Sequence, residues 1–184
     1  LLVSVNNPPV NALGAAVRQG LMAAMEQADA SAAVKAVVIV GEGKAFIAGA
    51  DIREFGKPPV LPFLPDVCNR IEACSKPVVA VIHGAALGGG LEIAMSAHYR
   101  LALPGAKLGL PEVLLGLVPG AGGTQRAPRL MGVKAATELM LSGQQIGAKA
   151  GLAAGLVDQL EEGTDPVAAG LAYARELLAQ GAPL

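Results

Sequence analysis

The chain has 184 residues, of which 53% are hydrophobic and 16% are charged, and its formal net charge is -1. This length suits a single domain, 1–184, with enough apolar residues for a sizeable core. The sequence contains no run of basic residues, so nucleic acid is not an expected partner. It also contains no stretch of about 18 uninterrupted apolar residues, the length that a membrane span requires.

The first part of the chain alternates between strand and helix signals and then becomes irregular. Apolar residues recur every four positions at Leu13, Val17, Leu21 and Met25, a spacing typical of one buried helix face. Proline is frequent between 57 and 65, which predicts a loop. The expected elements are a strand Leu2–Val5, a helix Ala12–Ala28, a strand Val34–Val40, a short helix with Asp51 as its N-cap, a loop Lys57–Pro65 and a helix Asp66–Cys74.

The second part continues the alternation, without a linker or a fixed repeat. A strand begins at Pro77 and runs through VVAVIHG into the glycine-rich segment Gly84–Gly90. The expected elements after it are a helix 91–98, a strand Tyr99–Leu103, an extended segment Leu108–Leu110, a loop Pro111–Gly123, helices Thr124–Leu130, Val133–Leu141 and Ala148–Ala154, a strand Leu156–Leu160 and a helix Asp165–Ala179. This alternation predicts an α/β fold.

The glycine-rich segment after the strand at 78–84 has two readings. Glycines at a helix N-terminus leave backbone N–H groups free and give a ligand room to approach, and the helix dipole favours negative charge there. The segment lacks G-x-G-x-x-G and G-K-[S/T], so NAD and ATP sites are disfavoured. In the alternative reading, the small residues serve only tight packing between strand and helix.

Two glutamates stand in apolar surroundings. Glu92 follows the glycine cluster, and Glu112 follows Pro111 in GLPEVLLGLVPG. Each can be a first-turn acid that interacts with a helix dipole. A pair of carboxylates can also divide the activation of one water, with one acting as base and the other as acid, because an apolar site moves their pKa values apart.

The remaining reactive side chains give weaker signals. Cys68 and Cys74 do not form C-x-x-C and have no nearby histidine to complete a zinc pattern, so we expect two reduced thiols, no metal, and a reducing compartment such as the cytoplasm. The start of the chain shows no signal-peptide pattern. His83 and His98 are expected to be packed or capping residues. Phe46 and Tyr99 are expected in the core.

Three segments in this order resemble the crotonase, or enoyl-CoA hydratase/isomerase, superfamily. They are KAFIAGADIREF at Lys44–Phe55, SKPVVAVIHGAALGGGLEIAM at Ser75–Met95 and LGLPEVLLGLVPGAGGTQRAPRLMG at Leu108–Gly132. The segment NNPPVNAL near the start and the pattern at Ser142–Asp158 also resemble the family. The resemblance implies a spiral of β-β-α units, truncated at the C-terminal helices, that assembles into trimers or hexamers.

The resemblance also implies roles for single residues. Ala50 and Gly89 match the positions whose N–H groups form an oxyanion hole for a thioester carbonyl, and Glu92 and Glu112 match the acids that hold and activate water. The stretch that matches the contacts to the adenine end of coenzyme A consists of Ala48, Gly49, Asp51 and Ile52. Lys44 and Arg53 are either phosphate partners of coenzyme A or solvated surface charges.

The expected activity is therefore that of an enoyl-CoA hydratase, which adds water to trans-2-enoyl-CoA in fatty-acid β-oxidation. We expect Glu92 to activate the water and Glu112 to protonate the α-carbon. Coenzyme A belongs to the substrate, and no separate cofactor is expected. The alternatives are an enoyl-CoA isomerase or other crotonase chemistry, the hydratase part of a bifunctional hydratase/3-hydroxyacyl-CoA dehydrogenase, and a non-catalytic protein that binds acyl-CoA or RNA.

Overall fold

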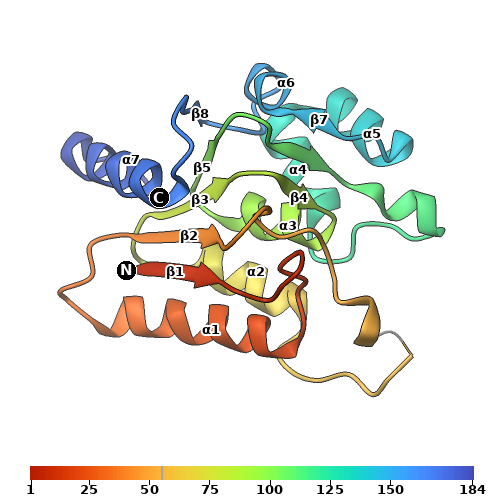
Figure 1. Cartoon of the computed structure of the whole chain (residues 1–184), viewed down its shortest axis with the longest axis horizontal. Coiled ribbons are helices and arrows are strands. Elements are labelled where there is room, and N and C mark those ends of the chain that lie inside the picture. The colour runs from red at the N-terminus through yellow and green to blue at the C-terminus, as the bar shows by residue number, and fades with distance from the viewer. Residues whose placement is uncertain (55) are drawn as a thin grey trace.

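The computed structural model describes residues 1–54 and 56–184, and Phe55, the last residue of the segment KAFIAGADIREF, lies outside them (Figure 1). The strands are β1 (Leu2–Val5), β2 (Val37–Gly41), β3 (Val78–Ile82), β4 (Ala85–Leu87), β5 (Tyr99–Ala102), β6 (Lys107–Gly109), β7 (Ile146–Gly147) and β8 (Gln159–Leu160). The α-helices are α1 (Ala15–Ala30), α2 (Leu64–Glu72), α3 (Gly89–Ser96), α4 (Gly123–Met131), α5 (Val133–Ser142), α6 (Ala148–Ala153) and α7 (Pro166–Gln180). Two short 3-10 helices are η1 (Ile52–Glu54) and η2 (Pro111–Leu115).

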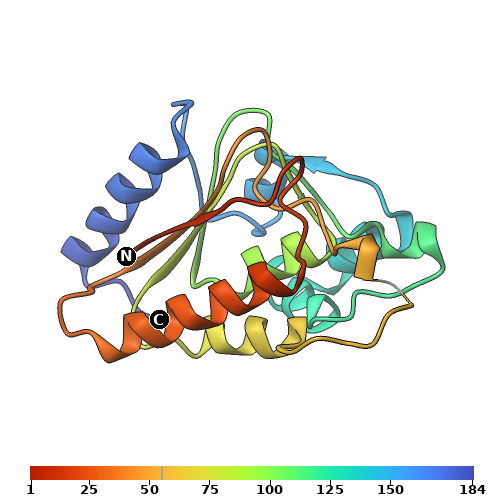
Figure 2. The same ribbon diagram turned by 60° about the horizontal axis from the view of Figure 1, so that its bottom comes forward.

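The larger sheet has five strands in the order β1-β2-β3-β5-β8, and every neighbouring pair is parallel. Strands β2 and β3 are buried along their whole length, as expected for valine-rich strands covered on both faces. Figure 2 shows α7 on one face of this sheet and α1 and α2 on the other. The mixed order of helices and parallel strands confirms the predicted α/β class.

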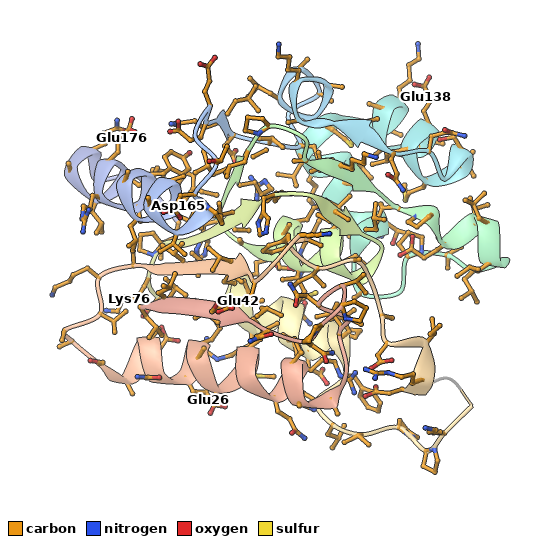
Figure 3. All side chains as sticks on the ribbon, viewed as in Figure 1. Glu26, Glu42, Lys76, Glu138, Asp165 and Glu176 are labelled. Carbon is orange, nitrogen blue, oxygen red and sulfur yellow. The ribbon has the colours of Figure 1, made fainter. Side chains whose placement is uncertain are left out.

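The two faces of the sheet belong to two separate apolar clusters. Alternate residues of β2 and β3, such as Ile39 and Ala80, point toward the larger cluster with α1, α2 and α3. Their neighbours Val38 and Val81 point toward the smaller cluster under α7. This division follows directly from the two-residue period of a strand. Asp165 caps α7 by accepting the N–H groups of residues 167 and 168 (Figure 3).

The smaller sheet joins β4, β6 and β7 and stands beyond the carboxyl ends of β2 and β3. Strand β4 is parallel to β6, and β6 is antiparallel to β7. Two isolated bridges, Leu13 to Ala50 and Ile47 to Ala86, attach the segment after β2 to its surroundings. Consequently the loop after β2 and the loop after β3 lie beside each other.

Several predicted boundaries are corrected by the structure. The first helix begins after Gly14 instead of at Ala12, and α2 begins at Leu64, so Pro65 belongs to its first turn and not to a loop. A proline is tolerated there because first-turn N–H groups have no intrahelical acceptor. The predicted helix 91–98 begins earlier, at Gly89, and Asp51 does cap η1 by accepting the N–H of Arg53 at 3.0 Å.

Other predicted elements differ in kind or length. The expected strand Leu156–Leu160 is reduced to β8, and the expected loop Pro111–Gly123 opens with η2. Strands β4 and β7 were not predicted at all. Both are only two or three residues long and depend on partners distant in the sequence, so local residue pattern could not indicate them.

Candidate active site

The loops that follow two neighbouring parallel strands bring Ala50 and Gly89 together. The loop after β2 is fixed by backbone bonds from Leu13 N–H to the Gly49 carbonyl at 2.9 Å and from Leu87 N–H to the Ile47 carbonyl at 3.2 Å. Gly89 is the first residue of α3. A Cβ atom placed on Gly89 would lie 3.9 Å from the backbone nitrogen of Ala50. The two backbone donors therefore lie close together.

Both of these N–H groups are available to a ligand. Gly89 occupies the first position of α3, where an N–H has no intrahelical acceptor. Within residues 1–54 and 56–184, neither the N–H of Ala50 nor that of Gly89 donates to a protein acceptor. The positive end of the α3 dipole adds to the attraction for negative charge. The arrangement therefore provides a two-donor site for an oxygen that carries negative charge.

Ala50 and Gly89 line a cavity of about 400 Å³, and both predicted acids, Glu92 and Glu112, line the same cavity. Of the predicted site residues, the cavity lining includes Ala48, Gly49, Ala50, Ile52, Gly89, Glu92 and Glu112. Apolar side chains surround them, notably Leu64, Leu87 and Leu117. Asp51 instead lines two adjacent cavities. The structure thus brings together seven of the eight residues that the sequence suggested.

Glu92 is buried, with 2% of its surface exposed, and it is held from outside its own helix. Its Oε1 accepts the N–H of Ala121 at 2.7 Å and the N–H of Gly123 at 2.8 Å. Gly123 begins α4, so the carboxylate also meets the positive end of that helix. Burial raises the pKa of Glu92, while the two N–H donors and the charge of Arg126 oppose the rise. A simple capping role in α3 does not describe this residue.

Glu112 is the second residue of η2 and is half-buried. Its Oε2 is buried and has no hydrogen-bond partner among the described residues. Burial raises the pKa of Glu112, and the negative charge of Glu92 raises it further. The environments of the two acids therefore differ: two N–H donors and Arg126 oppose the rise in the pKa of Glu92, whereas the charge of Glu92 adds to the rise in the pKa of Glu112.

The segment predicted to contact coenzyme A is partly occupied by its own ion pair. Arg53 donates to Asp51 with an Nη2–Oδ2 distance of 2.7 Å, and these bonds lower the pKa of Asp51 to about 2. The Arg53 side chain is otherwise exposed, as are Ile52 and Lys44. Ala48 donates its N–H to the Val10 carbonyl at 3.1 Å. This edge of the cavity therefore combines hydrogen-bonded backbone with one exposed apolar side chain, that of Ile52.

The weaker candidates lie outside the cavity. His98 accepts the N–H of Val78 at its Nδ1, 3.0 Å away, and so is a capping residue as expected. His83 has both ring nitrogens buried without a partner among the described residues. Phe46 is fully buried, whereas Tyr99 packs edge-on against another ring at the border of the smaller cluster.

The two cysteines are free and buried, and burial raises the pKa of Cys68 to about 11. Within the part of the chain that the structure describes, no helix is long and apolar enough to cross a membrane.

Sequence reasoning missed the groups that hold Glu92. They are the backbone N–H groups of Ala121 and Gly123 and the guanidinium of Arg126, which donates to the Ala121 carbonyl at 3.0 Å. A signal for them was present, since the Gly122-Gly123 pair precedes a helix and permits close approach of other groups. The partner could not be named because Glu92 lies about thirty positions earlier in the chain.

Comparison with known proteins agrees with this geometry. The family model described as Enoyl-CoA hydratase/isomerase matches residues 1–182. A relative from Danio rerio named peroxisomal bifunctional enzyme is 53% identical over 161 residues, which cover 88% of this chain and 22% of that protein. A relative from Bacillus subtilis (strain 168) named probable enoyl-CoA hydratase is 45% identical over 163 residues, covering 85% of this chain and 63% of that protein.

A solved structure has the same fold. The crystal structure of an enoyl-CoA hydratase from Mycobacterium tuberculosis H37Rv aligns with a TM-score of 0.90 and 34% identity, over 97% of this chain and 71% of that one. The chain thus spans about a fifth of the bifunctional relative and somewhat less than two thirds of the Bacillus relative. The expected crotonase-type fold is confirmed, and the chain belongs to the enoyl-CoA hydratase/isomerase family.

Proposed function

We propose that this chain hydrates trans-2-enoyl-CoA thioesters by syn addition, giving 3-hydroxyacyl-CoA in fatty-acid β-oxidation. The observation that carries the proposal is the shared cavity, in which two free N–H groups face two glutamates with unlike environments. The names of the relatives from Danio rerio and Bacillus subtilis support the same chemistry. We take 1–184 as one crotonase-type unit in this reaction.

In the proposed reaction the thioester oxygen accepts hydrogen bonds from the N–H groups of Ala50 and Gly89. When water adds to the β-carbon, the electrons of the double bond move toward the thioester and the oxygen becomes an enolate. Fixed donors stabilise this charge without having to reorganise, and loss of one such donor typically costs about 2.7–4 kcal/mol of transition-state stabilisation. The apolar lining of the cavity strengthens these interactions by excluding bulk water.

The proton transfers follow from the two acid environments. Glu92, whose carboxylate already accepts two N–H groups, takes a proton from the water as the new C–O bond forms. Glu112, which has a buried oxygen without a donor, gives its proton to the α-carbon as the enolate collapses. The hydroxyl of the water ends on the β-carbon and the proton of Glu112 on the α-carbon, so the proton taken up by Glu92 must pass to Glu112 before the next turnover. The division of labour uses two carboxyls in different surroundings, one held by two N–H donors and the other with a buried oxygen that has no partner among the described residues.

The coenzyme A portion of the substrate is proposed to lie along the rim formed by Ala48, Gly49, Asp51 and Ile52. Backbone at this edge of the cavity can bind the adenine end, and Ile52, which is 75% exposed, can cover it. Arg53 is paired with Asp51, so we assign it first to that ion pair and treat Lys44 as a solvated surface charge. No cofactor other than the coenzyme A of the substrate enters this proposal.

The proposal is tested by following the loss of the conjugated enoyl-thioester absorbance when crotonyl-CoA is added. Glu92→Gln and Glu112→Gln should each lose most of the turnover, and Glu138→Gln, an exposed acid on α5, should keep it. Fast loss abolished by both site variants supports hydration by the pair. A folded wild-type protein that binds crotonyl-CoA without consuming it would contradict the proposal.

Isomerisation is the second candidate, because Glu112 alone can move a proton between two carbons of the acyl chain. Incubation with a 3-enoyl-CoA distinguishes the activities, since isomerisation creates the conjugated absorbance that hydration removes.

We further propose that the chain assembles into a homotrimer or hexamer, and analytical ultracentrifugation would test this by measuring the mass of the assembly.

The cellular location is a separate proposal. We propose the cytoplasm, which the two free thiols support. The eukaryotic relatives are named as peroxisomal, so localisation of the gene product in its own cell must distinguish the two compartments.

A further inference from the structure

Arg126 lies on α4 but directs its guanidinium back toward the turn that precedes its own helix. Its Nη1 donates to the carbonyl of Ala121 at 3.0 Å. Its Nη2 donates to Asn69 Oδ1 at 3.0 Å and to Glu72 Oε2 at 2.7 Å, both on α2. The residue is 8% exposed. One buried cation therefore ties the turn 121–123 to a neighbouring helix.

The same turn holds the carboxylate of Glu92 through peptide groups on either side of that carbonyl. The N–H groups of Ala121 and Gly123 both point to Glu92 Oε1, at 2.7 and 2.8 Å. The carbonyl that joins them, that of Ala121, is the one bonded to Arg126. Three successive peptide groups are thus held, the outer two by Glu92 and the middle one by Arg126. Because each peptide group is planar, holding the Ala121 carbonyl fixes the plane of the middle group, and the two donors can then turn only about the φ and ψ angles of Ala121 and Gly122.

The sequence of the turn leaves space for both side chains. A Cβ atom on Gly122 would lie 2.3 Å from Arg126 Nη1, and the φ of +97° at Gly122 is one that residues with side chains rarely adopt. A Cβ atom on Gly123 would lie 2.9 Å from Glu92 Oε1. One glycine therefore admits the guanidinium, and the next admits the carboxylate.

We propose that Arg126 is a positioning residue for Glu92: by holding the Ala121 carbonyl, it aims two N–H donors at the carboxylate and keeps it oriented toward the water. This inference rests on the proposed hydration, in which Glu92 is the base. Arg126 itself touches neither the cavity nor the substrate, so it acts only through the turn.

The charge of Arg126 acts in the same direction as the hydrogen bonds. Its positive charge favours the ionised form of Glu92, which burial disfavours. The other ionisable groups around this carboxylate are Glu112 from η2 and Cys68 and Glu72 from α2. Cys68 has a pKa raised to about 11 by burial, so it stays neutral. Glu72 is already paired with Arg126.

The test compares Arg126→Gln and Arg126→Lys with Arg129→Gln, which removes an exposed charge from the same helix. In folded Arg126→Gln, kcat on crotonyl-CoA should fall by about 10- to 100-fold with little change in KM, as expected when a reacting group is misplaced. The acid limb of kcat should move to higher pH. Arg126→Lys keeps the positive charge, so its acid limb should lie at the wild-type pH while kcat is only partly restored. Arg129→Gln should match wild type in both.

The pKa of the Glu92 carboxyl can be measured by ¹³C NMR, with its signal assigned from the spectrum of Glu92→Gln. This measurement tests the positioning role of Arg126 without depending on catalytic activity. The pKa of Glu92 should rise in Arg126→Gln even if wild type proves not to hydrate crotonyl-CoA, and in that case only the proposed function fails. An unchanged Glu92 pKa and unchanged kcat in folded Arg126→Gln would overturn the positioning role. If Arg126→Gln does not fold, Gly122→Ala, which displaces the guanidinium sterically, must reproduce the loss of kcat and the shift.

Discussion

Glu92 Oε1 accepts the N–H of Gly123 at 2.8 Å, and a Cβ atom on Gly123 would lie only 2.9 Å from that same oxygen. The hydrogen bond therefore depends on the absence of a side chain at residue 123. The carboxylate fits against the start of α4 because residue 123 is glycine.

Replacement of Gly123 by alanine should displace the Glu92 carboxylate. We expect kcat on crotonyl-CoA to fall by about 10- to 100-fold, because a shift of about 1 Å in a reacting group has effects of this size. Gly20→Ala is the control, since no atom lies within 4 Å of a Cβ there. It lies inside α1 and should stabilise the fold by about 0.5–1 kcal/mol with normal kcat. Steady-state kinetics and thermal melts measure both effects.

Removal of the ionisable group at position 112 should stabilise the unliganded protein at high pH. The pKa of Glu112 is raised by burial, so the folded state binds its proton more tightly than the unfolded state does. The wild-type protein therefore loses stability as pH rises from the unfolded pKa through the folded one, by about 1.4 kcal/mol for each unit of difference. Glu112→Gln lacks this loss. Urea titrations at pH 5 and pH 8 should show its advantage growing with pH, and a constant difference would contradict the buried-acid explanation.

Asn11 should prove important for the loop that carries Ala50. Its Nδ2 donates to the carbonyls of Glu42 and Ala45 at 2.8 Å and of Phe46 at 3.2 Å, and its φ is +55°. Asn11→Gly tolerates that φ but loses the bonds, at a cost of about 1 kcal/mol each.

Asn11→Ala also loses the bonds and adds a strain of about 1–2 kcal/mol, because alanine disfavours the left-handed backbone conformation. Its unfolding midpoint should therefore lie at a lower denaturant concentration than that of Asn11→Gly. Equal stability of the alanine and glycine variants would show that the backbone conformation at this position carries no strain. Denaturant unfolding of the two variants side by side makes the comparison.

Asp29 should account for part of the acid sensitivity of the fold. It accepts both the N–H and the hydroxyl of Ser75, at 2.9 and 2.6 Å, and it pairs with Arg70. The Ser75 bonds are the main cause that holds the pKa of Asp29 below its usual range. Its stabilising contribution is therefore present above the unfolded pKa and is lost as pH falls through the folded one.

Asp29→Asn should accordingly lower the free energy of unfolding by about 2 kcal/mol at pH 7. The difference from wild type should shrink as the solution is acidified. Urea unfolding at pH 7 and pH 3 measures this change, and Glu26→Gln, an exposed acid on the same helix, should leave both values unchanged.

The elements predicted from sequence are those whose signals are local. The four-residue spacing from Leu13 to Met25 and the apolar run at Val37–Val40 identified α1 and β2, because burial of one face or of both leaves a periodic pattern. Strand β4, with the sequence AAL, leaves no such pattern. It exists because Ala85–Leu87 pairs with β6, a contact that depends on the folded chain.

The candidate site divides in the same way. Glu92 and Glu112 were predicted because a carboxylate in an apolar sequence is unexpected, and the structure places both on one cavity. Their functions in catalysis stay predictions. The partners of Glu92 at Ala121 and Gly123 could not be predicted from composition, since backbone donors have no sequence signature beyond the glycines that make room for them.

The parallel pairing of β2 with β3 has a consequence for the geometry of the two N–H donors. The loop that ends at Ala50 follows β2, and the path to Gly89 follows β3, where Val40 stands opposite Val81. Neighbouring strands lie about 4.8 Å apart in the hydrogen-bonding direction, a spacing that side-chain changes alter little. The spacing of β2 and β3 therefore helps to set the distance between the two N–H donors that bind the thioester oxygen. Sequence changes in the acyl part of the cavity can therefore alter substrate preference without moving the point at which charge develops.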